Sequence, residues 1–317
     1  MKLKPKRLNK GDTIGVVAPA SPIRSRGHLH QAVKELKSWD FQVKLGEHVY
    51  RKHGYMAGTD QERADDLNAM FKDKTIDAIM VTNGGYGSGR ILDLLDYNMI
   101  KQNPKLLVGF SDITSLHLAL QKKTGLVTFH GPGVMKWNPQ DFSSYSKEYL
   151  LKAISNNAPI GAIKVEDDKN WVDIIYPGQV QAEIVGGNLA LLCASLGTPY
   201  EIDTKGKILF FEDWNLEPWM MDTYIQHLKN AGKLDDAVGF VIGECAHCDP
   251  VFHAGTGIYG CLSLEELFAE LIQPFGKPAI YGLPLGHTAS LATIPLGVEA
   301  YLDATNGKLV IKENGVI

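Results

Sequence analysis

The chain has 317 residues, of which 44% are hydrophobic and 21% are charged. This balance is typical of globular proteins and excludes fibrous and disordered classes, and the length predicts two domains or one large α/β unit. The formal net charge of −4 argues against a nucleic-acid partner, because such surfaces carry a clustered basic excess.

The sequence predicts a cytoplasmic protein with no membrane partner. No apolar segment of signal-peptide type follows the basic start at residues 1–7, and no apolar run is long enough to cross a bilayer. The cysteines are too few and too unevenly spaced for a disulfide scaffold, which agrees with a reducing compartment; they are Cys193, Cys245, Cys248 and Cys261.

The first half of the chain alternates between strand and helix patterns. A capping-box spacing begins the second helix at Thr59, and a glycine-rich loop at 83–89 leads from the third strand into a helix that reaches Leu95. Such alternation predicts a parallel sheet with helices on its faces. The expected strands are 13–18, 41–45, 76–82 and 106–110, and the other expected helices are 28–39, 59–71 and 113–121.

The pattern loosens after Gly125, and the segments 132–139 and 155–170 have the composition of connectors. We therefore expect an N-terminal domain at 1–160 and a C-terminal domain at 178–317. In the second domain the predicted strands are 179–185, 207–211, 237–242 and 278–281, the helices 189–196, 220–231 and 264–272, with a Gly-Gly-Asn turn at 186–188 and a terminal β pair of 297–302 with 308–311.

Ligand sites in open α/β sheets gather beyond the carboxyl ends of the strands, and Ser111 occupies such a position. A serine at a sharp strand-to-helix turn is exposed and lies near the N–H groups of the helix start, which can stabilise an oxyanion. The match to G-x-S-x-G is partial, because Ile113 stands where the second glycine would be. The alternative is that Ser111 or Asp112 caps the following helix.

Two further side chains at strand ends complete a candidate triad. A nucleophilic serine needs a base, usually histidine, and the histidine needs a carboxylate to orient it. Glu212 follows a strongly apolar strand and His287 follows Gly-Leu-Pro-Leu-Gly, so Ser, Glu and His come in the chain order of α/β-hydrolase triads. Asp213 competes with Glu212, and His287 could instead be a structural histidine.

Neither a cofactor nor a metal is expected. The loop containing Gly84 and Gly85 suits an anion or oxyanion, but it lacks G-x-G-x-x-G spacing and does not lie in the first β-α unit, so it does not predict a dinucleotide. The segment Cys245–Asp249, with His253 nearby, resembles a zinc site but lacks a second well-spaced pair. We expect it to line the cleft instead.

Six motifs together resemble the LD-carboxypeptidase family of serine peptidases, which includes the microcin C self-immunity peptidases. They are Gly-Asp-Thr-Ile-Gly-Val-Val-Ala-Pro-Ala-Ser at 11–21, Gly-Gly-Tyr-Gly-Ser at 84–88, Gly-Phe-Ser-Asp-Ile-Thr at 109–114, Gly-Gly-Asn-Leu at 186–189, Phe-Phe-Glu-Asp at 210–213 and Gly-Leu-Pro-Leu-Gly-His at 282–287. They follow the family's order and run nearly end to end.

The resemblance implies a flavodoxin-like N-terminal domain, a smaller α/β C-terminal domain and an active site at their junction. It also implies roles for the candidate residues: Ser111 as nucleophile, His287 as general base, Glu212 as its orienter, and backbone N–H groups of Gly84, Gly85 and Asp112 as the oxyanion hole. Family members pair as homodimers and need no metal. Asn83 departs from the family, since many of its carboxypeptidases have arginine before Gly-Gly.

The expected function is a serine carboxypeptidase that cleaves an L,D-peptide bond and releases terminal D-Ala from muropeptide tetrapeptides in cell-wall recycling. One alternative is a peptidase of the microcin-immunity type, which cuts an aminoacyl-nucleotide amide and would need an aromatic platform such as Trp171, Trp214 or Trp219. The other is a non-catalytic protein that binds an anion on the glycine loop.

Overall fold

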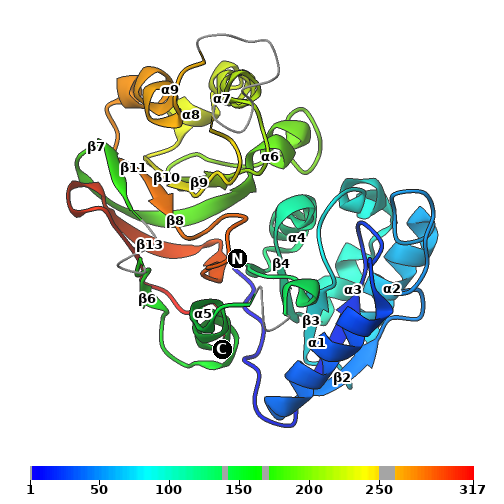
Figure 1. The fold of residues 1–317 in the computed structure, drawn as a ribbon. Helices are drawn as coiled ribbons and strands as arrows, with labels where there is room; N and C mark the ends of the chain where they lie inside the picture. Colours follow the sequence, from blue (N-terminus) through cyan, green and yellow to red (C-terminus); the bar gives the residue numbers. More distant parts are fainter. Residues whose placement is uncertain (1, 138–141, 166–170, 250–260) are drawn as a thin grey trace. The chain divides into compact units, whose positions relative to one another are not determined.

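The computed structural model describes residues 2–137, 142–165, 171–249 and 261–317 (Figure 1). Its contacts divide the chain into two compact units. The first contains residues 1–159, 293–297 and 314–317, and the second contains residues 160–292 and 298–313. The return of 293–297 and 314–317 to the first unit was not predicted from the sequence.

The first unit is built on a six-stranded sheet with the order β12-β5-β4-β3-β1-β2. All neighbours are parallel except β12, which pairs antiparallel with β5. The order of the five parallel strands is that of flavodoxin-like folds, as expected. The strands are β1 (Thr13–Val17), β2 (Gln42–Leu45), β3 (Ala78–Val81), β4 (Leu106–Gly109), β5 (Thr128–His130) and β12 (Ile294–Leu296).

Helices connect these strands, as right-handed β-α-β crossovers require. The predicted capping box is present: the Thr59 side chain accepts from the N–H of Glu62, whose carboxylate accepts from the N–H of Thr59. The α-helices are α1 (Arg26–Ser38), α2 (Asp60–Lys72), α3 (Tyr97–Gln102), α4 (Thr114–Thr124) and α5 (Ser144–Ser155), and short 3-10 segments are η1 (Ser88–Leu94), η2 (Ser111–Ile113) and η3 (Val134–Lys136).

The second unit is built on an eight-stranded sheet with the order β6-β14-β13-β8-β9-β10-β11-β7. Its central strands β8 to β11 are parallel, and the strands on both flanks are antiparallel. The predicted terminal β pair is confirmed as β13 and β14. The strands are β6 (Gly161–Ala162), β7 (Asp173–Tyr176), β8 (Gln179–Asn188), β9 (Ile208–Glu212), β10 (Gly239–Gly243), β11 (Ala279–Leu283), β13 (Val298–Asp303) and β14 (Lys308–Ile311).

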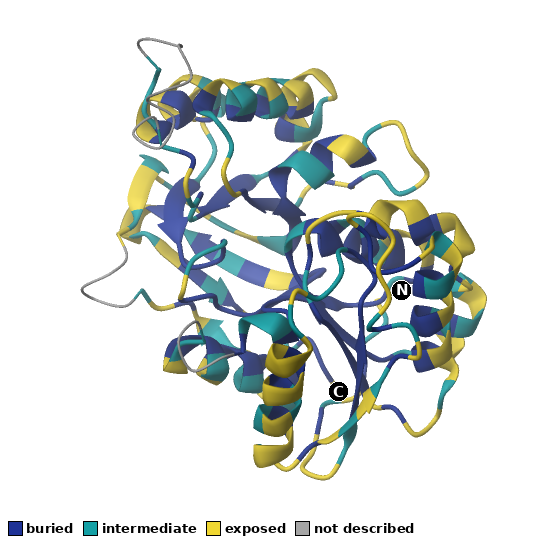
Figure 2. Cartoon of the chain, turned by 45° about the vertical axis from the view of Figure 1, so that its right-hand side comes forward, coloured by how far each residue is buried: buried dark blue, intermediate teal, exposed yellow. Residues whose placement is uncertain are grey.

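The helices of this unit are α6 (Leu189–Ser195), α7 (Pro218–Asn230), α8 (Lys233–Asp236) and α9 (Leu264–Leu271), and Figure 1 shows α7, α8 and α9 gathered on one face of the sheet. Most central strands of both units are buried along their length, while the helices bury one face and expose the other (Figure 2). Among the described residues, no helix has both the length and the apolar character to cross a membrane.

Several elements escaped the sequence patterns, namely α3, β6, β7 and α8 as well as β5, β12 and α5. Strands β5 and β12 have three residues each, too few to show an alternation, and β12 is defined only by its distant partner β5. Helix α5 was not predicted either, although Ser143 caps it by accepting from the N–H of Ser146. Its sequence follows a connector with no strand signal, so no β-α unit was expected there.

The predicted turn at 186–188 is wrong, because these residues continue β8 and pair with β9. Gly186 has φ +147°, and a Cβ atom there would lie 1.7 Å from the carbonyl oxygen of Phe210. The glycine is needed for a close approach of two backbones within the sheet.

Gly186→Ala is therefore expected to lower the free energy of unfolding by about 2 kcal/mol or more, since the methyl group must separate β8 from β9. The matched control is Gly27→Ala, where the new methyl group meets nothing nearer than 3.6 Å on an exposed helix. It should be neutral or stabilising by about 0.5–1 kcal/mol. Urea unfolding measures both variants, and equal effects would contradict the packing argument.

Candidate active site

Ser111 lies directly after β4 with φ +64°, in the left-handed region that few residues other than glycine adopt. The strand ends at Gly109, Phe110 is extended, and η2 begins at Ser111 before α4 continues. A serine in this backbone conformation at a strand-to-helix turn has the geometry of a nucleophile elbow.

The capping alternative does not describe this turn. Neither η2 nor α4 has a side-chain capping hydrogen bond at its start. The carboxylate of Asp112 instead accepts from the N–H of Ser88 at 2.8 Å, and the Ser88 hydroxyl donates to the carbonyl of Asp112 at 2.5 Å. These two bonds join the glycine loop to the turn at Ser111. Burial raises the pKa of Asp112, while the hydrogen bonds from the loop oppose that shift.

The glycine loop passes very close to the serine. A Cβ atom on Gly84 would lie 2.8 Å from the Cβ of Ser111 and 3.2 Å from the amide nitrogen of Asp112. Gly85 has φ +106°, and a Cβ there would meet the Ser21 side chain, whose hydroxyl accepts from the N–H of Tyr86 at 3.1 Å. Only glycine allows the loop backbone to approach the serine in this way.

Arg63 also holds the glycine loop, by donating to the carbonyl of Gly87. This role was not predicted from the sequence. The Arg63 side chain is fully buried and donates from Nη1 to the carbonyls of Pro19 and Gly87, and from Nη2 to Asp60. The available signal was its spacing, because Arg63 lies four residues before Leu67 on the buried stripe of α2. An arginine on that stripe needs buried acceptors.

His117 is the histidine nearest to Ser111 in sequence, and its surroundings exclude it as the base. It is fully buried in α4, and its Nε2 lies 2.9 Å from the carbonyl oxygen of Gly109, so that nitrogen must carry the proton. Burial lowers the pKa of His117 to about 3. The ring is a neutral support for the end of β4.

In the second unit, His287 and Glu212 form a direct pair. Glu212 ends β9 and is fully buried, and its Oε2 lies 2.6 Å from Nδ1 of His287. A Cβ on Gly286 would lie 1.9 Å from the carbonyl oxygen of Glu244, so a glycine is needed for the chain to bring His287 here. Trp214 stacks on the imidazole, with ring centroids 6.1 Å apart and planes 23° apart.

Asp213 does not share the role of Glu212. Its carboxylate accepts from the amide of Asn188 at 3.0 Å and from the N–H groups of Ala190 and Trp214 at 2.9 and 2.8 Å. It therefore satisfies the start of α6. Burial, reinforced by the charge of Glu212, raises the pKa of Asp213 to about 6.

The segment Cys245–Cys248 supports the loop that follows Glu212. The N–H of Asn215 donates to the carbonyl of Ala246 at 2.9 Å, and the N–H of Leu216 donates to the sulfur of Cys248 at 3.4 Å. Both thiols are buried, and burial raises their pKa. No metal-binding group of three ligands occurs among the described residues, and His253 lies outside them.

The other exposed tryptophans lie elsewhere in the second unit. Trp171 packs edge-on against Tyr281 with centroids 4.8 Å apart, and the indole N–H of Trp219 donates to Glu217 at 2.7 Å. Of the three tryptophans considered as platforms, Trp214 has the contact with a candidate catalytic side chain.

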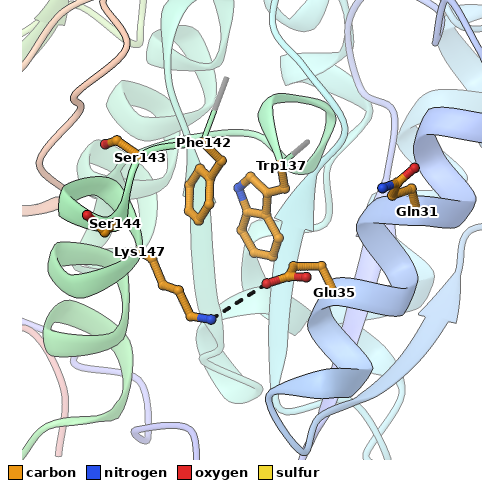
Figure 3. Close-up of a pocket in the computed structure, with 7 residues that line it drawn as sticks. All are labelled: Gln31, Glu35, Trp137, Phe142, Ser143, Ser144 and Lys147. Carbon is orange, nitrogen blue, oxygen red and sulfur yellow. Dashed lines mark ion pairs between the residues drawn. The ribbon is translucent and has the colours of Figure 1, made fainter. Parts of the chain in front are cut away.

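A separate cavity of about 200 Å³ lies in the first unit between α1 and α5 (Figure 3). Trp137 and Phe142 form its aromatic wall, and Lys147 pairs with Glu35 at 3.6 Å across it. Neither Ser111 nor the glycine loop lines this cavity. It is smaller than the usual ligand pocket of about 300–1,000 Å³.

The two halves of the chain match the two models of one peptidase family. Residues 14–131 match the LD-carboxypeptidase N-terminal domain, and residues 181–302 match the LD-carboxypeptidase C-terminal domain. A probable murein peptide carboxypeptidase of Bacillus subtilis is 40% identical over 99% of this chain and 95% of its own length. The chain therefore belongs to the LD-carboxypeptidase family, and it is a carboxypeptidase by family.

Solved structures agree with this assignment and with the two-domain α/β fold. The microcin C7 self-immunity protein MccF has a TM-score of 0.89 at 25% identity, covering 99% of this chain and 100% of its own. That protein has also been solved in complex with aspartyl sulfamoyl adenosine. A muramoyltetrapeptide carboxypeptidase from Oxalobacter formigenes has a TM-score of 0.80 at 27% identity, covering 95% of this chain and 99% of its own.

The raised pKa of Asp213 gives a prediction for stability against pH. The folded chain holds this proton up to about pH 6, whereas an unfolded aspartate releases it near pH 4, so the folded state binds more protons in that window. Raising the pH from about 4 to about 6.5 should therefore cost wild type about 2 kcal/mol of unfolding free energy relative to Asp213→Asn. Above that window the difference is constant.

Urea unfolding at a series of pH values measures the difference. Asp235→Asn, which removes an exposed carboxylate of the same unit, controls for the loss of one negative charge. A difference between wild type and Asp213→Asn that does not change with pH would show that this carboxyl group does not carry the effect.

Proposed function

We propose that the protein is a serine carboxypeptidase in which Ser111 is the nucleophile, His287 the general base and Glu212 the carboxylate that orients it. The observation that carries this proposal is the 2.6 Å contact between Glu212 and Nδ1 of His287. In this contact Nδ1 of His287 is hydrogen-bonded to the carboxylate, so Nε2 is the nitrogen that exchanges protons with the serine. Ser111 and the pair lie on separate units, so their meeting is part of the proposal.

In the proposed reaction, His287 takes the proton of Ser111 while the serine oxygen attacks the amide carbonyl. The carbonyl oxygen becomes an oxyanion held by backbone N–H groups of Gly84, Gly85 and Asp112. His287 then protonates the leaving amine, and water, activated in the same way, releases the acyl group from Ser111. The buried carboxylate of Glu212 stabilises the imidazolium that forms during acylation of Ser111 and again during release of the acyl group.

The substrate we propose is a muropeptide tetrapeptide, cleaved at the L,D bond to release D-Ala for cell-wall recycling. Support comes from the similarity to a probable murein peptide carboxypeptidase of Bacillus subtilis and from the structural likeness to a muramoyltetrapeptide carboxypeptidase. We further propose a homodimer that needs no metal, as the family resemblance implies, and that works in the cytoplasm without a cofactor.

Single replacements in the proposed triad should greatly slow turnover while leaving the binding of the peptide substrate intact. Ser111→Ala and His287→Ala are each expected to lower kcat for an L,D-tetrapeptide by about 10³-fold or more, and Glu212→Gln by about 10²-fold or more. Release of D-Ala measures the rate, and the KM should change little. Full activity in Ser111→Ala would disprove the nucleophile assignment, and wild-type binding without turnover would favour the anion-binding alternative.

The proposed oxyanion hole can be tested with two glycines of one loop. Gly84→Ala places a methyl group 2.8 Å from the Cβ of Ser111 and is expected to lower kcat by about 10²–10³-fold. Gly89→Ala meets nothing nearer than the Ser115 hydroxyl at 3.6 Å and should retain activity. If both variants behave alike, the loop does not act at the reacting carbonyl.

A second candidate function is cleavage of an aminoacyl-nucleotide amide, as in microcin immunity. The stacking of the half-exposed Trp214 on His287 favours this function, because an aromatic ring beside the proposed general base His287 can hold the nucleobase of the substrate. A side-by-side assay of an L,D-tetrapeptide and an aminoacyl sulfamoyl adenosine separates the two functions. Trp214→Ala should impair cleavage of the nucleotide substrate far more than that of the peptide.

A further inference from the structure

A carboxypeptidase must recognise the terminal carboxylate of its substrate, which lies one residue beyond the bond that is cut. Successive Cα atoms are ~3.8 Å apart, so this carboxylate must lie within one residue's length of the carbonyl that Ser111 attacks. A charged donor placed there gives stronger recognition than a neutral one. The inference below rests on the proposed function and concerns the residue that supplies this charge.

Asn83 in the glycine loop and the two arginines that lie near this loop are not suited to bind the carboxylate. The side chain of Asn83 is neutral, and its amide donates to the carbonyls of Ser21 and Gly84 at 3.3 and 2.9 Å. Arg63 has no exposed side-chain surface, and Arg90 forms a two-bond ion pair with Asp60 at 3.0 and 2.8 Å.

Lys136 is placed beside the nucleophile turn itself. Its Nζ lies over the ring of Phe110, 5.3 Å from the centroid, and Phe110 immediately precedes Ser111. It belongs to η3, which follows β5, and β5 is the parallel neighbour of β4. The carboxyl ends of adjacent parallel strands meet at one edge of the sheet, so Lys136 and Ser111 share that edge.

The segment that carries Lys136 is held in place by contacts with the end of β3. The N–H of Met135 donates to the carbonyl of Thr82 at 2.9 Å. A Cβ on Gly133 would lie 2.6 Å from that same oxygen and 3.2 Å from the Cα of Asn83. The lysine thus extends from a fixed backbone, and its side chain is only partly exposed. Partial removal from water strengthens its attraction for an anion.

We propose that Lys136 binds the terminal carboxylate of the peptide and thereby selects substrates with a free C-terminus. The face of Phe110, the residue before Ser111, holds the ammonium group by a cation–π contact. The lysine acts as a point charge and does not take part in proton transfer.

The test compares one L,D-tetrapeptide as its free acid and as its C-terminal amide. In wild type the acid should be the better substrate, and Lys136→Gln should lower kcat/KM for the acid by about 10–100-fold, mainly through KM. The amide should be affected less than threefold, and Lys136→Arg should restore most of the preference. Lys152→Gln, which removes a partly exposed lysine of the same unit, is the control.

Calorimetric binding to the Ser111→Ala protein tests the inference independently of turnover. The acid should bind more tightly than the amide, and the added Lys136→Gln change should abolish that difference. Equal effects of Lys136→Gln on both peptides, or no effect on either, would overturn the inference. A wild-type protein that binds the acid through Lys136 but releases no D-Ala would instead disprove the proposed function.

Discussion

The structure around Ser111 depends on one contact, which joins the glycine loop at 83–89 to the turn at Ser111. Asp112 and Ser88 exchange two hydrogen bonds, and Gly84 leaves no room for a side chain between the loop and Ser111. Because the turn has a positive φ at a serine, it needs such support from its surroundings. Arg63 and His117 extend that support to α2 and to the end of β4.

The surroundings of His287 in the second unit depend on the burial of two adjacent acids with different partners. Glu212 contacts His287, whereas Asp213 accepts from the Asn188 amide and from the N–H groups of Ala190 and Trp214. The Cys245–Cys248 segment holds the loop between this pair of acids and α7. A carboxylate with a single histidine partner in a buried place is suited to stabilise imidazolium.

Much of the fold could be predicted from sequence, because most strands are apolar runs bounded by clear turn signals and Thr59 carries a complete capping box. The failures have physical reasons. Strands β5 and β12 are too short to show a period, and the glycines at 186–187 looked like a turn when they serve a close backbone approach. A pair of glycines in the sequence fits a turn and a close backbone approach equally well, so the sequence does not distinguish the two.

Residue identity and spacing were enough to recognise the family, the order of its motifs and the candidates Ser111, Glu212 and His287. Three features become visible in the folded chain alone: Glu212 rather than Asp213 meets His287, Asp112 holds the loop instead of capping a helix, and Lys136 lies over Phe110. Each of these features depends on contacts between segments that are far apart in the chain. The local sequence around a residue does not determine which distant side chain packs against it.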